Sequence, residues 1–253
     1  MFYFADFFGK KVLKSTLLDG LEHFFTTRDF VLHSGNREDL TETATCNVDF
    51  LREKLGLSES QLYRCQQRHT NNVAVASHDS ENFFENTDGI VLTEKNTAAF
   101  LNFADCIPII MYDFVENIGA VVHAGWRGTA SKIQQKAVEI MCQKGSTPEN
   151  IKAAIGAGIG ICCFDVNEDV FEQIMRDIDL NYAKSVNAYK ESKEKDKYFI
   201  DLKKVNEILL NQVSVKQIDT ADYCTSCSTD VFFSYRKENG NTARHSAVLK
   251  IRG

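Results

Sequence analysis

The sequence has few of the features that separate one domain from the next. It contains only two prolines, Pro108 and Pro148, and it has no Gly/Ser-rich linker, low-complexity tract or internal repeat. Hydrophobic residues make up 43% of the 253 positions, which is ordinary for a globular chain. We therefore expect residues 1–253 to fold as a single domain around a substantial core.

The chain also lacks an excess of positive charge and a long apolar run. Its 29 Lys and Arg residues face 35 Asp and Glu residues, which gives a formal net charge of −6. This balance argues against duplex nucleic acid as a partner, although local arginines could still bind a small anion. The longest uncharged stretch in the middle of the chain runs from Ala153 to Phe164. It is shorter than the ~20 apolar residues of a membrane helix, so we expect no membrane partner.

The first residues lack the charge order of a secretory signal, because Lys10, Lys11 and Lys14 follow the apolar residues instead of preceding them. Eight cysteines are scattered through the chain, and without an export signal we expect reduced thiols in the cytoplasm. The pair Cys224-x-x-Cys227 indicates a zinc site only weakly, since a four-thiolate site needs a second pair. Packing thiols are the simpler interpretation of this pair.

Hydrophobic periodicity predicts both helices and strands. Helices are expected near 47–56 with Asn47 as the cap, near 130–143, around 170–178, and from 202 onward behind an Asp201 cap. Runs of β-branched and aromatic residues predict strands at 73–76, 89–93, 98–103, 107–112, 118–123, 231–235 and 247–251. Consecutive strands followed by mixed strand and helix favour a layered α+β fold with a mixed sheet over a Rossmann domain. The glycines of residues 156–160 do not have the dinucleotide-binding spacing.

A hydrophobic strand that ends in His123 leads through a Gly-Trp-Arg-Gly turn into the helix expected near 130–143. Amide groups at a helix start and an arginine side chain form a natural anion site. Arg127, Gly128 and Thr129 are therefore candidate phosphate contacts. A structural arginine paired with a buried carboxylate fits the same spacing equally well.

Three potential metal ligands lie at the ends of predicted strands. His69 precedes one strand, Cys106 lies between two strands, and His123 ends another. Their separations are too long for a zinc finger, but they are compatible with convergence on one metal ion with a free coordination position. Each residue taken singly is more often an ordinary buried side chain than a ligand.

Several blocks of the chain together resemble the YfiH/YlmD family of laccase-domain proteins, also called multicopper polyphenol oxidases. The blocks are Gln67 to Thr70, Asp88 to Thr93, Ala104 to Pro108, His123 to Gly128, Gly156 to Val166, Cys224-Thr225 and Phe232 to Arg236. The resemblance implies an α/β/β/α sandwich with mixed β-sheets. It also implies a purine nucleoside phosphorylase that uses phosphate to convert adenosine, inosine or methylthioadenosine to free base and ribose-1-phosphate. Adenosine deaminase and polyphenol oxidase activities are the implied side activities.

The resemblance also implies roles for individual residues. His69, Cys106 and His123 correspond to the family's metal ligands, with zinc as the expected ion and copper as the alternative. One His₂Cys set is not the several copper centres that laccase chemistry requires. Cys106, Asp105 and Arg127 are the implied catalytic residues, with Arg127 as the phosphate clamp, and Arg28 is a further phosphate contact. Asp105 would carry a proton or, more simply, orient a ligand.

The chain departs from the family pattern at three places. Thr70 replaces a glycine and Ala157 a proline, which predicts a reshaped pocket, and residues 29–47 are shortened, which weakens the assignment of Arg28. Two other functions stay open. The first is a metal-independent cysteine hydrolase with Cys106 as nucleophile and His123 as base. The second is a non-enzymatic nucleoside-binding or metal-binding protein. The pattern predicts no oligomeric state.

Overall fold

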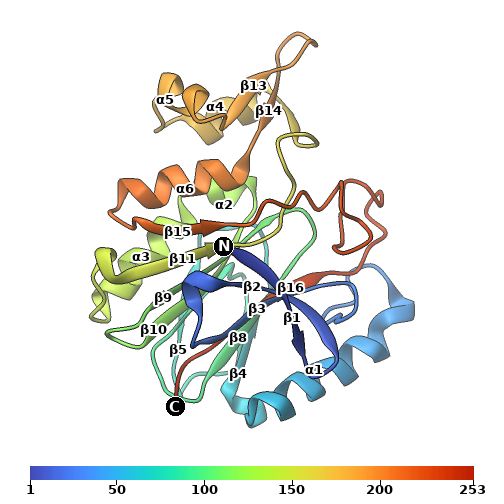
Figure 1. The fold of residues 1–253 in the computed structure, drawn as a ribbon, viewed down its shortest axis with the longest axis vertical. Helices are drawn as coiled ribbons and strands as arrows, with labels where there is room; N and C mark the ends of the chain where they lie inside the picture. Colours follow the sequence, from blue (N-terminus) through green and yellow to red (C-terminus); the bar gives the residue numbers. More distant parts are fainter.

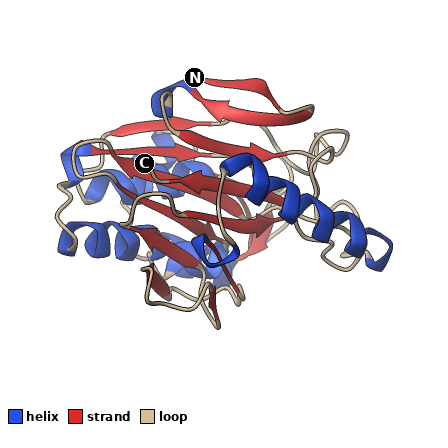
Figure 2. Ribbon diagram, turned by 90° about the horizontal axis from the view of Figure 1, so that it is seen from below, coloured by secondary structure: helices blue, strands red, loops and turns tan.

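Two mixed β-sheets packed face to face form the centre of the computed structural model, which describes residues 1–253 (Figures 1 and 2). The first sheet has the order β1-β2-β3-β16-β8-β4-β6, with bounds β1 Phe2–Phe7, β2 Lys10–Ser15, β3 Glu22–Thr26, β16 His245–Lys250, β8 Ala98–Phe103, β4 Leu62–Cys65 and β6 Phe83–Phe84. The second sheet has the order β15-β11-β9-β10-β7-β5, with bounds β15 Gln217–Thr220, β11 Ile151–Ile155, β9 Ile107–Asp113, β10 Ile118–Ala124, β7 Gly89–Leu92 and β5 Val73–Ala76.

Both sheets combine parallel and antiparallel pairs. In the first sheet β4 runs parallel to β8 and β6, and in the second β5 runs parallel to β7 and β11 to β15. The central pair of the second sheet, β9 and β10, is antiparallel, and its register places His123 opposite Pro108. This pairing brings the start of β9 beside the end of β10, which is where Cys106 and His123 lie.

The alternation of side chains along each strand builds two cores around the second sheet. In β9, Ile110 and Tyr112 face the first sheet and belong to the core between the sheets, whereas Ile109 and Met111 face the helices. A strand covered on both faces is apolar at nearly every position, which explains the continuous apolar run of β9. The sequence pattern therefore predicts that both faces of β9 are buried, and the structure shows that helices cover one face and the first sheet covers the other.

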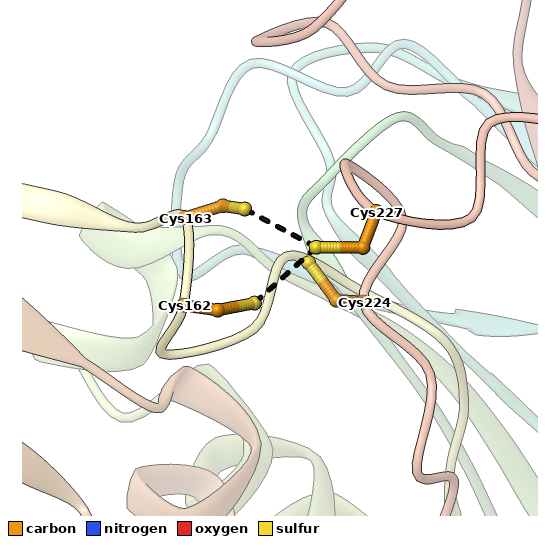
Figure 3. A group of neighbouring side chains, drawn as sticks. All are labelled: Cys162, Cys163, Cys224 and Cys227. Carbon is orange, nitrogen blue, oxygen red and sulfur yellow. Dashed lines mark hydrogen bonds between the residues drawn. The ribbon is translucent and has the colours of Figure 1, made fainter.

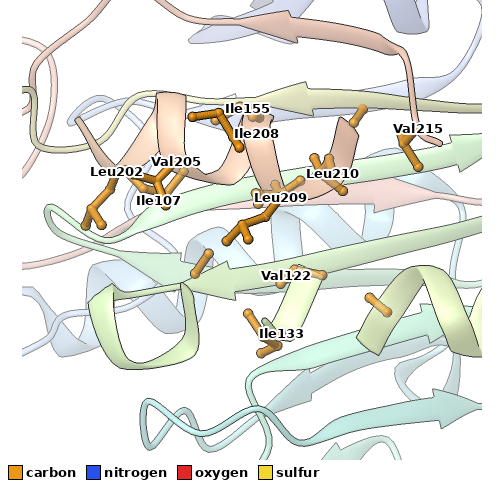
Figure 4. Packing of buried hydrophobic residues seen from close by; sticks show 14 of the residues in the cluster. Ile107, Val122, Ile133, Ile155, Leu202, Val205, Ile208, Leu209, Leu210 and Val215 are labelled. Atoms are coloured by element: carbon orange, nitrogen blue, oxygen red, sulfur yellow. The ribbon is translucent and has the colours of Figure 1, made fainter. Parts of the chain in front are cut away.

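Helices cover the two outer faces. The six α-helices of the chain have the bounds α1 Thr41–Leu55, α2 Trp126–Ala130, α3 Ile133–Gln143, α4 Glu168–Met175, α5 Leu180–Ser185 and α6 Leu202–Gln212. Figure 1 shows α1 on one side of the strands and α3 and α6 on the other, where side chains of α3 and α6 pack against the second sheet (Figure 4). The expected α/β/β/α sandwich is confirmed. A small antiparallel sheet of β12 Asp165–Asn167, β14 Lys197–Ile200 and β13 Tyr189–Glu191 lies with α4 and α5 at one end of the molecule.

Apart from shifts of one to three residues at the ends of elements, the predicted elements agree with the structure except at three places. Helix α1 begins at Thr41, so the predicted cap at Asn47 is wrong; Asn47 is buried inside the helix and its amide donates to the Val31 carbonyl at 2.8 Å. The helix expected near 130–143 is two helices, α2 and α3, because Lys132 between them adopts a left-handed φ of 60°. The strand expected at 231–235 is wrong, since these residues form an irregular segment of turn and bend with no strand pairing.

The Asp201 cap of α6 is confirmed, since its carboxylate accepts hydrogen bonds from the backbone amides of Lys203 and Lys204 at 3.0 and 3.2 Å.

Burial explains why the sequence of the segment 231–235 resembles that of a strand. Phe232 and Phe233 are fully buried, and Phe232 packs in the core between the sheets. Their aromatic character therefore reflects tertiary packing rather than strand structure. None of the six helices has both the length and the apolar content to cross a bilayer.

Candidate metal centre

Three potential ligand side chains converge at one edge of the second sheet. His69 lies in the loop after β4, Cys106 immediately precedes β9, and His123 lies near the end of β10. Their ligand atoms all lie within 4.8 Å of one another, and Nε2 of His69 is 3.7 Å from Sγ of Cys106. The two imidazole rings meet edge to face with centroids 4.9 Å apart. The structure thus brings together the three residues that the resemblance implied as metal ligands.

A buried carboxylate, Asp88, positions both histidines. Its Oδ1 accepts a hydrogen bond from Nδ1 of His123 at 2.8 Å and another from the His69 amide at 3.0 Å. Its Oδ2 accepts hydrogen bonds from the amides of Arg68 and Thr70 and from the Thr70 hydroxyl. Because Nδ1 of His123 is held by Asp88, Nε2 is the nitrogen left to face Cys106 and a metal ion.

The sequence pattern did not predict this role of Asp88. The only sequence signal was its place at the start of the Asp88 to Thr93 block, directly before β7. Burial alone would raise the pKa of the Asp88 carboxyl, but hydrogen bonds from His123 and Thr70 outweigh burial and hold the pKa well below its usual value. Thr70, which was expected to reshape the pocket, instead donates its hydroxyl to Asp88 and does not line the cavity.

Cys106 and His123 form a charged pair when no metal is bound. Burial opposes charge on both groups, but the attraction of His123 and hydrogen bonds from both histidines lower the pKa of Cys106 to about 6. The same attraction from Cys106, with the hydrogen bond to Asp88, raises the pKa of His123 to about 9. Near neutral pH the sulfur is therefore a thiolate, which is the form that ligates metal ions and attacks electrophiles.

Gly125 lets His69 and Cys106 approach the turn after β10. A Cβ atom at this position would lie 2.9 Å from Cδ2 of His69 and 3.0 Å from Sγ of Cys106. Real Cβ atoms do not tolerate the shorter of these contacts, so the position needs glycine. The His-Ala-Gly-Trp-Arg-Gly motif thus supplies a ligand and, two residues later, the space for the other two ligands.

The three ligand residues lie on the wall of a cavity of about 870 Å³. This volume lies within the range of pockets that bind small molecules. Apolar side chains such as Phe100, Trp126 and Phe164 line part of the cavity. Four arginines also line it, namely Arg64, Arg68, Arg236 and Arg244.

The predicted phosphate contacts lie outside this lining. Arg127 is exposed, and its guanidinium lies 4.3 Å from the ring of its neighbour Trp126. Trp126 lines the cavity. Successive side chains of a helix point about 100° apart, so the side chain of Arg127 is directed away from the cavity that Trp126 lines. Gly128 is buried, and Thr129 is buried with its hydroxyl bonded to Asn206.

The second predicted arginine, Arg28, is held by structural contacts. Its guanidinium pairs with Glu238 at 2.5 Å, donates to the Phe232 carbonyl and lies over the Phe233 ring. The structure therefore does not bring Arg28, Arg127, Gly128 or Thr129 to the cavity. The arginines that do line it include Arg68 and Arg236, which stand in blocks that the sequence analysis used only for the family resemblance.

Asp105 joins the turn before β9 to the C-terminal part of the chain. Its Oδ1 accepts a hydrogen bond from the Thr225 hydroxyl at 2.6 Å, and its Oδ2 accepts one from the Arg236 amide at 2.7 Å. Its own carbonyl accepts a hydrogen bond from the Ile159 amide at 2.8 Å. With both carboxylate oxygens occupied in this way, Asp105 positions the cavity wall beside Cys106.

Comparisons with known proteins bear on this site. The family model described as multi-copper polyphenol oxidoreductase laccase matches residues 23–252. The chain is 35% identical over 170 residues to purine nucleoside phosphorylase YlmD of Bacillus subtilis (strain 168), an alignment that covers 66% of this chain and 59% of that protein. It is 31% identical over 250 residues to adenosine deaminase RL5 from an unknown prokaryotic organism, covering 90% of this chain and 92% of that protein.

A solved structure shows the same architecture. YlmD from Geobacillus stearothermophilus superimposes on this chain with a TM-score of 0.87 and 25% sequence identity, and the match covers 99% of both chains. The region matched by the family model contains all three converging ligand residues and Asp88. The chain therefore belongs to the laccase-domain family, which includes the YfiH and YlmD proteins.

Proposed function

We propose that this protein is a purine nucleoside phosphorylase with a zinc ion held by His69, Cys106 and His123. The observation that carries the proposal is the position of these three side chains on the wall of a cavity that four arginines also line. Relatives named purine nucleoside phosphorylase and adenosine deaminase support a reaction on purine nucleosides. Copper is the alternative ion.

The donor set fits zinc. Two imidazole nitrogens and one thiolate are ligands that this borderline-soft ion prefers, and three protein ligands leave a coordination position for substrate. The hydrogen bond from His123 to Asp88 is the outer-shell contact usual for a metal-ligating histidine. Bound there, zinc would supply a Lewis acid that polarises a substrate oxygen.

Phosphorolysis requires a phosphate ion to be held against the ribose C1′ atom, so that a phosphate oxygen forms a bond to C1′ as the bond from C1′ to the purine nitrogen breaks. The electron pair of that bond leaves with the base. Arg64 and Arg68 suit phosphate binding best, because both are exposed at the cavity and neither guanidinium has a hydrogen-bond or ion-pair partner in the chain. Phosphate roles for Arg28 and Arg127 stay predictions.

The two other arginines of the cavity have structural partners. Arg236 pairs with Asp165 at 2.7 Å and donates to the Cys163 carbonyl, and Arg244 donates to the carbonyls of Thr242 and Ala243. These contacts hold the two side chains in place on the cavity wall. The aromatic wall that includes Trp126 and Phe164 offers flat apolar surface for a purine ring. Charged and aromatic surface thus occupy the same cavity, as a nucleoside and phosphate require.

A product assay tests the proposal. Purified protein is incubated with adenosine, inosine or methylthioadenosine, with and without phosphate, and the products are resolved by mass. We expect free base and ribose-1-phosphate only when phosphate is present. Release of base at an equal rate in phosphate-free buffer would contradict phosphorolysis. Conversion of adenosine to inosine would instead indicate deamination, and binding of nucleoside without any product would indicate a non-enzymatic protein.

One observation favours a second candidate, a cysteine hydrolase. Cys106, His123 and Asp88 are linked in the order nucleophile, base and orienting carboxylate, with the pKa of the Cys106 thiol lowered to about 6. Alkylation by iodoacetamide distinguishes the candidates. A hydrolase exposes a reactive Cys106 as purified, whereas a metal enzyme has Cys106 protected until a chelator removes the ion.

A further inference from the structure

Four cysteines from two distant segments meet beside the cavity (Figure 3). Cys162 and Cys163 lie in the loop between β11 and β12, and Cys224 and Cys227 follow β15. Their four Sγ atoms all lie within 4.8 Å of one another, and Sγ of Cys227 is 3.5 Å from Sγ of both Cys162 and Cys163. The second pair that the Cys-x-x-Cys motif needs is therefore present, supplied by the fold.

The sulfur arrangement matches one tetrahedral metal ion. Four thiolates bound to zinc at about 2.3 Å lie about 3.8 Å from one another, and the separations here bracket that value. Figure 3 shows the four side chains directed toward a common point from opposite sides. The Cys-x-x-Cys segment is also a hydrogen-bonded turn, since the amides of Cys227 and Ser228 donate to the Cys224 carbonyl.

The backbone around Cys224 approaches its sulfur closely. The backbone amide of Gly160 donates to its Sγ at 3.2 Å. A Cβ atom at Gly160 would lie 3.0 Å from Cβ of Cys224, so glycine allows the two segments to approach. An amide directed at a ligand sulfur is the kind of outer contact that metal-binding cysteines have.

Other uses of four neighbouring cysteines fit less well. All eight cysteines of the chain are free thiols, and the 3.5 Å separations are far longer than the ~2.05 Å of a disulfide bond. An iron–sulfur cluster places sulfide between its irons, so its cysteine sulfurs are spread more widely than around a single ion. A single thiophilic ion uses all four sulfurs at once.

We propose that Cys162, Cys163, Cys224 and Cys227 bind one zinc ion as a structural site, separate from the site at His69, Cys106 and His123. Binding converts the four groups to thiolates and releases their protons to solvent. Four protein ligands leave no position for substrate, which is typical of structural rather than catalytic zinc.

The position of this four-cysteine site explains what the ion would stabilise. Thr225, within the Cys-x-x-Cys turn, donates its hydroxyl to Asp105, the residue before Cys106. Arg236 donates to the Cys163 carbonyl, and both Arg236 and Phe164 line the cavity. An ion at the four cysteines therefore joins the two loops that form one wall of the cavity and holds Asp105 in place.

Metal analysis of the full-length protein tests the proposal. Elemental mass spectrometry of protein purified under reducing conditions should give about two zinc ions per chain. The double substitution Cys224→Ser and Cys227→Ser should lower this to about one, and Cys106→Ala should also lower it to about one by emptying the other site. Cys46→Ser is the matched control, because Cys46 is an exposed cysteine on α1 outside both clusters, and it should leave the zinc content unchanged.

A spectroscopic measurement covers the case in which the double variant does not fold. Zinc X-ray absorption of the Cys106→Ala protein should show four sulfur neighbours at about 2.3 Å and no nitrogen neighbour. An unchanged metal content in the double variant, a Cys106→Ala protein without zinc, iron in place of zinc, or disulfides among the four cysteines in reduced protein would each overturn the proposal. If the site at His69, Cys106 and His123 holds no zinc, the unchanged protein and the Cys106→Ala protein should both contain about one zinc ion per chain. That result would contradict the proposed function and still support zinc at the four cysteines.

Discussion

At the residue scale, one carboxylate organises the loop and both histidines of the candidate metal centre. Asp88 is fully buried and accepts hydrogen bonds from three successive amides, the Thr70 hydroxyl and the His123 ring. Amides at three consecutive positions can reach one carboxylate only if the loop curls around it. The hydrogen bonds to Asp88 determine which ring nitrogen of His123 is left to face Cys106. They also hold His69 in a backbone conformation with a positive φ of 60°.

Asp88→Asn should weaken metal binding at the His69, Cys106 and His123 site about 10- to 100-fold. Asparagine replaces one of the two acceptor oxygens with an NH2 group and removes the negative charge, so hydrogen bonds to this side chain are lost and the contact that orients His123 is weakened. Competition with a chromophoric chelator measures the affinity. Thr70→Val removes one of the five hydrogen bonds and keeps the charge, so it should weaken binding less. Equal affinities of Asp88→Asn and the unchanged protein would refute a positioning role for Asp88.

Arg68→Gln should raise the KM for phosphate about tenfold, equivalent to about 1.4 kcal/mol, with a much smaller effect on the KM for nucleoside. The reason is that Arg68 lines the cavity without a partner in the chain. Arg127→Gln is the matched control, since Arg127 is an exposed arginine outside the lining. Steady-state kinetics with varied phosphate provide the measurement. A larger effect for Arg127→Gln would return the phosphate site to the helix start predicted from the sequence.

At the scale of elements, predictions succeeded where local pattern and packing agree. The strands at 73–76 and 98–103 have the predicted bounds, because each is a short apolar run that is paired within a sheet. The start of α1 was missed because its first turn, at Thr41 to Ala44, is polar and mostly exposed and carries little periodicity. Turn residues at 231–235 were mistaken for a strand because two buried phenylalanines pack there for tertiary reasons.

Asp201→Ala should lower the free energy of unfolding by about 1 kcal/mol. The carboxylate of Asp201 accepts hydrogen bonds from two amides at the start of α6, and alanine leaves both without this partner. Asp201→Asn is the control, because asparagine caps helices about as well as aspartate. Urea unfolding measures the difference. Since Leu202 of α6 lines the cavity, the capped start of this helix also positions part of the cavity wall.

At the scale of the whole molecule, two sheets enclose a core that contains a titratable side chain. His245 is fully buried, and its ring packs near Phe103 and Phe232, with centroids 6.2 and 5.5 Å away. Burial lowers its pKa to about 3. The folded state therefore requires neutral His245, whereas the unfolded chain takes up a proton near pH 6.5. Stability from this residue is complete above pH 6.5 and is lost as the pH falls toward 3.

His245→Leu should make the protein less sensitive to acid. Between pH 7 and pH 5 the unchanged protein should lose about 2 kcal/mol of unfolding free energy through His245, and the leucine variant should not show this part of the loss. Urea unfolding at the two pH values gives both numbers. The comparison uses the difference between pH values, so a uniform destabilisation caused by the different shape of the leucine side chain does not affect it. An identical pH dependence in both proteins would show that His245 is not the group responsible.

The sequence alone indicated the layered α+β class, through local periodicity, and the family, through motifs within single segments. The resemblance to that family, and not the spacing of the residues, implied His69, Cys106 and His123 as the ligands of the candidate metal centre. Tertiary structure alone placed Asp88 against His123, put Arg64 and Arg68 rather than Arg127 on the cavity wall, and joined Cys162 and Cys163 to Cys224 and Cys227. Each of these contacts joins side chains from separate segments. Spacing along the chain reports which residues share a face of one helix or strand, but contacts between elements depend on how the sheets and loops pack.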